Sequence, residues 1–69
     1  MVYLLHFERR YWHAGHYLGW TQDLPGRMRA HRAGDGARLM EVINEHGIRW
    51  VVSRVWWDGD RTLERALKA

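Results

Sequence analysis

Five side chains of the types that phosphodiester cleavage needs are spread along this chain. They are the phenols of Tyr3 and Tyr17, the guanidinium of Arg27, the imidazole of His31 and the carboxylate of Glu64. A carboxylate can hold a divalent cation, a guanidinium can stabilise charge on a phosphoryl oxygen, and phenols or an imidazole can orient water. Each residue alone also has an ordinary structural explanation, so the prediction depends on their order and on the elements that bring them together.

Those elements are predicted by hydrophobic patterning, turn residues and helix caps. The expected strands cover residues 1–7, 16–21 and 48–57, and the expected helices cover 23–32, 37–46 and 61–68. The connecting segments are a hairpin connection over 8–15 and turns over 33–36 and 58–60. The first two strands are antiparallel because their connection is too short for a crossover helix. The order ββααβα predicts an α+β fold, a small three-stranded antiparallel sheet flanked by helices.

Size and composition favour a single domain that is stabilised by packing alone. Sixty-nine residues are near the lower limit for a core that folds unaided, and the chain has no cysteine for a disulfide or a thiolate metal site. Five tryptophans are present, and each ring buries roughly 150–250 Å². We therefore expect most of the tryptophans to lie in the core.

The charge balance is compatible with a polyanionic partner. The formal charge is +3, and ten of the eleven basic residues are arginine, which binds phosphate through two parallel hydrogen bonds. No apolar run is long enough to span a membrane and no signal peptide is visible. These features predict a cytoplasmic protein with no membrane association, and they make a polyanionic partner plausible.

The first predicted helix carries polar residues on the side that should face the sheet. On a helical wheel His31 falls between Leu24 and Arg27. A guanidinium that leaves water needs an anion. One interpretation is an internal ion pair of Arg27 with Glu41 or Glu64. The other is that this side of the helix borders a cleft where a phosphate binds.

Five segments share their order and spacing with one known family. Met1-Val2-Tyr3 stands in the place of its first signature and Tyr17-Leu18-Gly19 in the place of its second. The other segments are 21–31, with Asp23-Leu24, Arg27 and His31, then the glycine-containing turn 33–38, and 63–68, which contains Glu64. Together they resemble the GIY-YIG nuclease family, in particular its short stand-alone bacterial members. The resemblance covers essentially the whole chain and implies one nuclease domain over residues 1–69.

Two departures from the family pattern are visible. The first signature keeps only its tyrosine, because Met1-Val2 replaces Gly-Ile. The family also usually has an asparagine shortly after the glutamate helix, whereas this chain ends at Ala69. We therefore expect either a domain truncated at its C-terminus or a member that lacks this residue.

The resemblance assigns roles to the five residues. Glu64 corresponds to the only protein ligand of one Mg²⁺ or Mn²⁺. One phenol, with Tyr3 favoured, would help to deprotonate or orient the attacking water, and Tyr17 would position water or phosphate. Arg27 would stabilise charge on the phosphoryl oxygens, and His31 would orient the nucleophile or protonate a group.

Further residues are expected to bind DNA. They are Gly19, which would permit a close approach of backbone and ligand, and the arginines Arg29, Arg32 and Arg38. His13 and His16 are weak evidence for zinc because no third ligand accompanies them. The resemblance thus implies a metal-dependent DNA endonuclease, with DNA as its partner and no small-molecule cofactor. The alternatives are a DNA-binding module with the same fold but impaired catalysis, and a protein-interaction domain.

Overall fold

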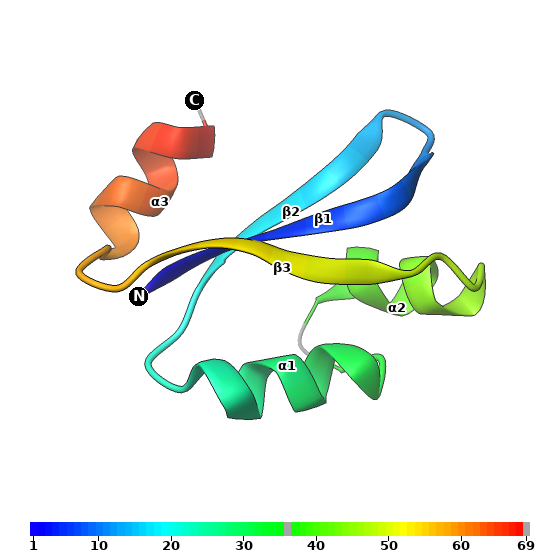
Figure 1. Ribbon diagram of the computed structural model, residues 1–69, viewed down its shortest axis with the longest axis horizontal. Coiled ribbons are helices and arrows are strands. Elements are labelled where there is room, and N and C mark those ends of the chain that lie inside the picture. Colours follow the sequence, from blue (N-terminus) through cyan, green and yellow to red (C-terminus); the bar gives the residue numbers. More distant parts are fainter. Residues whose placement is uncertain (36, 69) are drawn as a thin grey trace.

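The computed structural model describes residues 1–35 and 37–68, so that Gly36 of the predicted turn and Ala69 lie outside the described residues. Its elements are β1 (Val2–Tyr11), β2 (Ala14–Trp20), α1 (Leu24–Arg32), α2 (Arg38–Glu45), β3 (Trp50–Trp56) and α3 (Arg61–Lys68). The order ββααβα and the α+β fold are therefore confirmed (Figure 1).

The three strands form one antiparallel sheet with β1 in the centre, in the order β2-β1-β3. Tyr3 of β1 lies opposite Gly19 of β2 and opposite Val55 of β3. Because side chains alternate along a strand, Tyr3, Leu5 and Phe7 share one face of the sheet. We call it the inner face, and the opposite one the outer face.

The hydrophobic core lies between the inner face and the first two helices. Tyr3, Leu5 and Phe7 are buried there against Met40 and Ile43 of α2. The remaining buried members of the core are Ile48 and Trp50. In Figure 1 α1 and α2 lie together on one side of the strands, whereas α3 lies apart from them, near the N-terminus. The two sides of the sheet are therefore covered very differently.

Capping residues set the boundaries of the helices. The Asp23 side chain accepts a hydrogen bond from the Gly26 backbone N–H and begins α1, and Asp60 Oδ1 accepts one from the Leu63 N–H at 3.0 Å and begins α3. Gly47 follows α2 with a φ of +66°, a conformation that glycine adopts without steric cost. None of the described helices is long and apolar enough to cross a membrane.

Two predictions about the strands and the core are wrong. β1 continues to Tyr11 and β2 already begins at Ala14, so that a two-residue turn of Trp12 and His13 replaces the predicted connection over 8–15. Residues 8–10 are exposed, so this part of β1 lacks the alternation that identifies a half-buried strand. The tryptophans are not mainly core residues either: Trp12 is 81 % exposed, Trp57 is 68 % exposed, and among the five only Trp50 is buried.

Candidate active site

Four of the five predicted residues line one hollow of about 310 Å³. Tyr3 comes from β1, Tyr17 from β2, Arg27 from α1 and Glu64 from α3. Trp20, Arg61 and Arg65 also line it. We call this cavity the site hollow. It brings together side chains from four elements, and the fold thus positions residues that are far apart in the sequence.

The two phenols are set by the register of β1 and β2. Tyr17 lies opposite Leu5, and Tyr3 lies opposite Gly19, so the tyrosines are diagonal neighbours on the inner face. Their ring centroids are 6.1 Å apart. A Cβ atom on Gly19 would collide with the hydroxyl end of Tyr3 and would lie 2.9 Å from the Tyr17 ring. Gly19 therefore makes room for the tyrosine pair, which gives it a packing role beside the predicted contact with a ligand.

His31 acts on the site through Tyr3. Its side chain is completely buried and does not line the site hollow, and its Nε2 is 2.7 Å from the Tyr3 hydroxyl oxygen. Asn44 holds this end of α1, because its side-chain amide donates to the His31 carbonyl and accepts from Trp50 Nε1 at 3.1 Å. His31 is thus a positioning residue in this arrangement, with no surface to offer a substrate.

Burial keeps both members of this pair in their neutral forms. Desolvation, followed by the positive charge of Arg27, lowers the pKa of His31 from its usual value near 6.5. Desolvation, with smaller contributions from Tyr17 and Glu64, raises the pKa of Tyr3 well above its usual value, although Arg27 opposes the rise. At neutral pH Tyr3 is therefore a hydrogen-bond donor, and it is a poor base.

The proton on His31 can be assigned by elimination. Its Nδ1 is buried and has no hydrogen-bond partner. An unpaired buried N–H is rarer and costlier than an unpaired lone pair, so the proton belongs on Nε2, where it is donated to the Tyr3 oxygen. The Tyr3 hydroxyl proton is then left for Tyr17 or for an acceptor that enters the site hollow.

Arg27 is the charged residue on the inward side of α1. It is half-buried and shares the site hollow with Glu64. Glu41, the other anion considered for it, instead forms an ion pair with Arg38 at 2.9 Å. Arg27 therefore borders a cleft, and Glu64, the other anion considered for it, lines the same cleft.

Glu64 is the carboxylate that lines the site hollow among the described residues. Among residues 1–35 and 37–68, no three His, Cys, Asp or Glu side chains lie close enough to hold a metal ion together. A single carboxylate nevertheless fits Mg²⁺, which keeps several waters and commonly uses one or two protein carboxylates with substrate phosphates. Three guanidiniums line the same hollow. This charge disfavours a cation by itself, so the fit requires that a phosphate binds with it.

The other predicted DNA-binding arginines lie outside the site hollow. Arg29, Arg32 and Arg38 are exposed, the Arg32 guanidinium stacks 4.5 Å from the Trp50 ring centre, and Arg38 pairs with Glu41. Sequence reasoning missed Arg61 and Arg65, which the hollow contains. A signal for them existed: they are three residues before and one residue after Glu64, so all three lie on one side of the helix.

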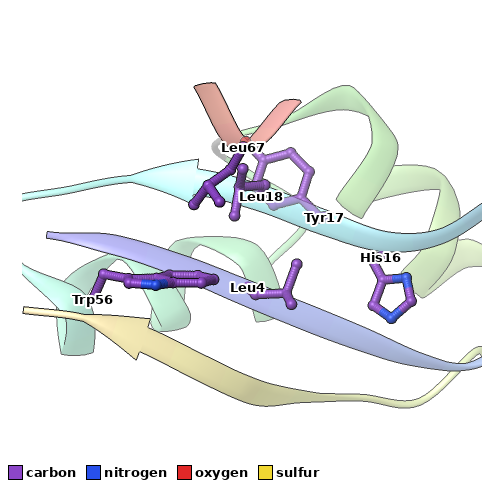
Figure 2. Close-up of a pocket in the computed structure, with 6 residues that line it drawn as sticks. All are labelled: Leu4, His16, Tyr17, Leu18, Trp56 and Leu67. Atoms are coloured by element: carbon purple, nitrogen blue, oxygen red, sulfur yellow. The ribbon is translucent and has the colours of Figure 1, made fainter. Parts of the chain in front are cut away.

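The remaining histidines lie elsewhere. His13 is in the hairpin turn, and the side chain of His16 is 3.0 Å from that of His6 on the outer face. Figure 2 shows His16 at one end of a second hollow of about 540 Å³, lined otherwise by Leu4, Leu18, Trp56, Leu67 and Tyr17. This outer hollow is mostly apolar, and among the residues that the structure describes its lining includes no carboxylate or guanidinium to hold a cation or a phosphate.

Comparisons of the chain with protein-family models, with curated proteins and with solved structures found no match. The residues of the site hollow therefore carry the functional argument.

Proposed function

We propose that this chain is a GIY-YIG-type nuclease domain that hydrolyses DNA phosphodiester bonds with one divalent cation, Mg²⁺ or Mn²⁺. One observation carries the proposal: Tyr3, Tyr17, Arg27 and Glu64, which the sequence resemblance selects, line a single hollow. They come from four elements, so their meeting is not a consequence of being neighbours in sequence. Phosphoryl transfer relies on positioning and on charge stabilisation, and these residue types supply both.

Arg27 binds the scissile phosphate in this proposal. Its position at the wall of the site hollow leaves its guanidinium able to donate to two phosphoryl oxygens. Negative charge grows on these oxygens as the bond to the leaving group breaks. A donor already held there in the free protein stabilises the transition state without reorganisation.

Glu64 holds the cation together with phosphate oxygens and waters. Mg²⁺ or Mn²⁺, when bound, would polarise the phosphate and stabilise the leaving oxygen. The carboxylate and Arg27 line the same hollow, so a phosphate bound there could contact both the cation and the guanidinium. Arg61 and Arg65 add positive charge on the side of α3 and attract the polyanion.

The two tyrosines have different roles in this proposal. Tyr17 is half-buried and is the phenol better able to touch the attacking water, whereas Tyr3 is 1 % exposed and its pKa is raised by burial. This reverses the order of preference that the resemblance suggests. Tyr3, fixed by His31, would donate its hydroxyl proton to Tyr17 or to a phosphate oxygen.

Cleavage of supercoiled plasmid and branched DNA in Mg²⁺ or Mn²⁺ tests the proposal. We expect nicking by the wild-type chain, and a fall of roughly 10²–10³-fold in Arg27→Gln, the usual cost of losing one charge-stabilising donor. Glu64→Gln should abolish nicking while DNA binding remains. The matched control is Arg49→Gln, an exposed arginine outside the site hollow, which should change the rate less than about threefold. Nicking that persists in Glu64→Gln would contradict the proposal.

A second candidate is a DNA-binding module with this fold that does not turn over. It is favoured by one observation: three arginines and a single carboxylate line the site hollow, which suits a bound phosphate better than a cation. DNA binding that weakens steeply with salt, without nicking in either metal, would identify this function.

A further inference from the structure

Trp20 and Arg61 form a stacked pair at the site hollow. Trp20 is the last residue of β2, and Arg61 is the first residue of α3. The guanidinium carbon of Arg61 lies 4.7 Å from the centre of the Trp20 ring. Both side chains line the hollow that contains Arg27 and Glu64.

The position of this pair distinguishes it from similar pairs elsewhere. Arg32 stacks on Trp50 at 4.5 Å, and Arg54 stacks on Trp56 at 4.9 Å. Neither of these pairs lines the site hollow, as far as the described residues extend. The Trp20–Arg61 pair alone among the three lies where a phosphate is expected. A structural explanation by cation–π attraction applies to all three, but it does not explain this location.

The chemistry of the pair suits a nucleobase. Indole rings and guanidinium planes both stack on the π-face of any base, and such stacking is tolerant of sequence. Trp20 is half-buried, so its ring is held in place, whereas Arg61 is exposed and can turn toward a phosphate. Arg65, one turn farther along α3, is available for the neighbouring phosphate. A volume of about 310 Å³ is at the lower end for small-ligand sites, which fits one nucleotide unit.

We propose that Trp20 and Arg61 are a stacking platform that binds one unpaired base next to the scissile phosphate, so that the preferred substrate is a single-stranded DNA segment. A base inside a duplex has both faces covered by its neighbours and cannot use such a platform unless it leaves the stack. The position of the phosphate rests on the proposed function; the platform itself rests on the Trp20–Arg61 contact and its place in the site hollow.

The test compares two octamers of equal charge in the absence of divalent cations. One is dT8, and the other has the same backbone with abasic units at all eight positions. Binding is measured by fluorescence anisotropy at one fixed salt concentration. We expect the wild-type chain to bind dT8 about tenfold more tightly than the abasic octamer, the effect of roughly one stacked base. A blunt duplex of matched length should bind more weakly than dT8.

Variants assign this preference to the platform. Trp20→Leu should bind both octamers with similar affinity, within about twofold, while its affinity for the abasic octamer stays unchanged. A merely structural tryptophan would lower both affinities together. Trp20→Phe should restore most of the preference because it keeps an aromatic face, and it also serves if the leucine variant does not fold. The control is Trp12→Leu, which removes an 81 % exposed tryptophan at the hairpin and should keep the wild-type ratio.

The outcomes separate this inference from the proposed function. A tenfold preference that survives in Trp20→Leu, or equal binding of both octamers by the wild-type chain, overturns the platform. Cleavage that depends on Glu64 would still support the nuclease. Conversely, the chain could prefer dT8 over the abasic octamer through Trp20 and yet never nick DNA. This result would support the platform and contradict the proposed nuclease activity.

Discussion

The sheet carries two pairs of aromatic rings between the same strands, one pair on each face. Tyr3 and Tyr17 lie on the inner face with ring centroids 6.1 Å apart, and His6 and His16 lie on the outer face with centroids 4.8 Å apart. Each pair joins β1 to β2, and each consists of groups that can hold or transfer protons. By residue type and spacing alone, either pair would be a candidate site.

Their surroundings differ completely. The tyrosine pair is supported by the buried His31 and shares a hollow with Arg27 and Glu64. The histidine pair is exposed, and its neighbours on that face are mainly apolar. Chemistry-bearing side chains therefore become a candidate site only where other elements add charge and exclude water. Helix α1 does so for the inner pair, because it brings both the imidazole and the guanidinium.

Removing the buried imidazole should have the largest effect on stability. His31→Ala leaves a cavity and takes away the hydrogen-bond partner of the Tyr3 hydroxyl, so we expect a loss of about 3 kcal/mol in the free energy of unfolding. His16→Ala on the outer face should change it by less than about 0.5 kcal/mol. Urea denaturation measures both. Equal losses of stability in the two variants would show that the surrounding protein does not support the inner pair more than the outer pair.

The space between the phenols can be tested with a matched pair of glycines on β2. Gly19→Ala places a methyl group against Tyr3 and Tyr17, which cannot move freely in the core, and should cost about 1–3 kcal/mol and disturb cleavage. In Gly15→Ala the nearest atom outside the chain neighbours would be Arg10 Cγ at 3.5 Å, an ordinary contact. That variant should stay within about 0.5 kcal/mol of the wild type. An unchanged urea midpoint for Gly19→Ala would refute the close packing described for this pair.

The dependence of stability on pH should be the smallest of these effects. We expect it to arise from His31, which supports the pair on the inner face. The pKa of His31 is lowered on folding, so the unfolded chain binds more protons as the pH falls below about 6.5, and the folded state loses stability. We expect this loss of stability to develop as the pH falls from 7.5 to 5.5. His31→Gln should flatten this slope, and His16→Ala should keep it. If the dependence of stability on pH disappears in His16→Ala, a group on the outer face is responsible for it and His31 is not.

The sequence predicts the elements best where local chemistry decides their bounds. The cap residue Asp60 and the apolar spacing after it define α3, and the predicted range agrees with the structure. The sequence predicts too long a connection between β1 and β2. Residues 8–10 are all exposed, so this end of β1 shows no alternation of buried and exposed side chains. Nothing in a local pattern distinguishes such a strand end from a loop. The exposure of Trp12 and Trp57 likewise depends on where the small core ends.

The candidate site likewise has a part that the sequence predicts and a part that depends on the tertiary structure. Tyr3, Tyr17, Arg27 and Glu64 were selected from order and spacing, and they meet in one hollow. Which arginines surround them was not predicted, because that depends on how α3 docks beside β2. Arg29, Arg32 and Arg38 lie on α1 and α2 away from the hollow, whereas Arg61 and Arg65 lie in it. The burial that makes Tyr3 a donor is also a tertiary property, and residue type alone did not reveal it.

The place of Glu64 on α3 separates the core from the proposed cation ligand along the chain. The sheet needs β3, and α3 follows β3 in chain order. The buried core residues lie between Tyr3 and Trp50, so all of them precede the carboxylate and the arginines of α3. In the proposed function, a chain that ended before residue 61 would keep these core residues, both tyrosines and Arg27. It would lack Glu64 and two of the three arginines that line the site hollow.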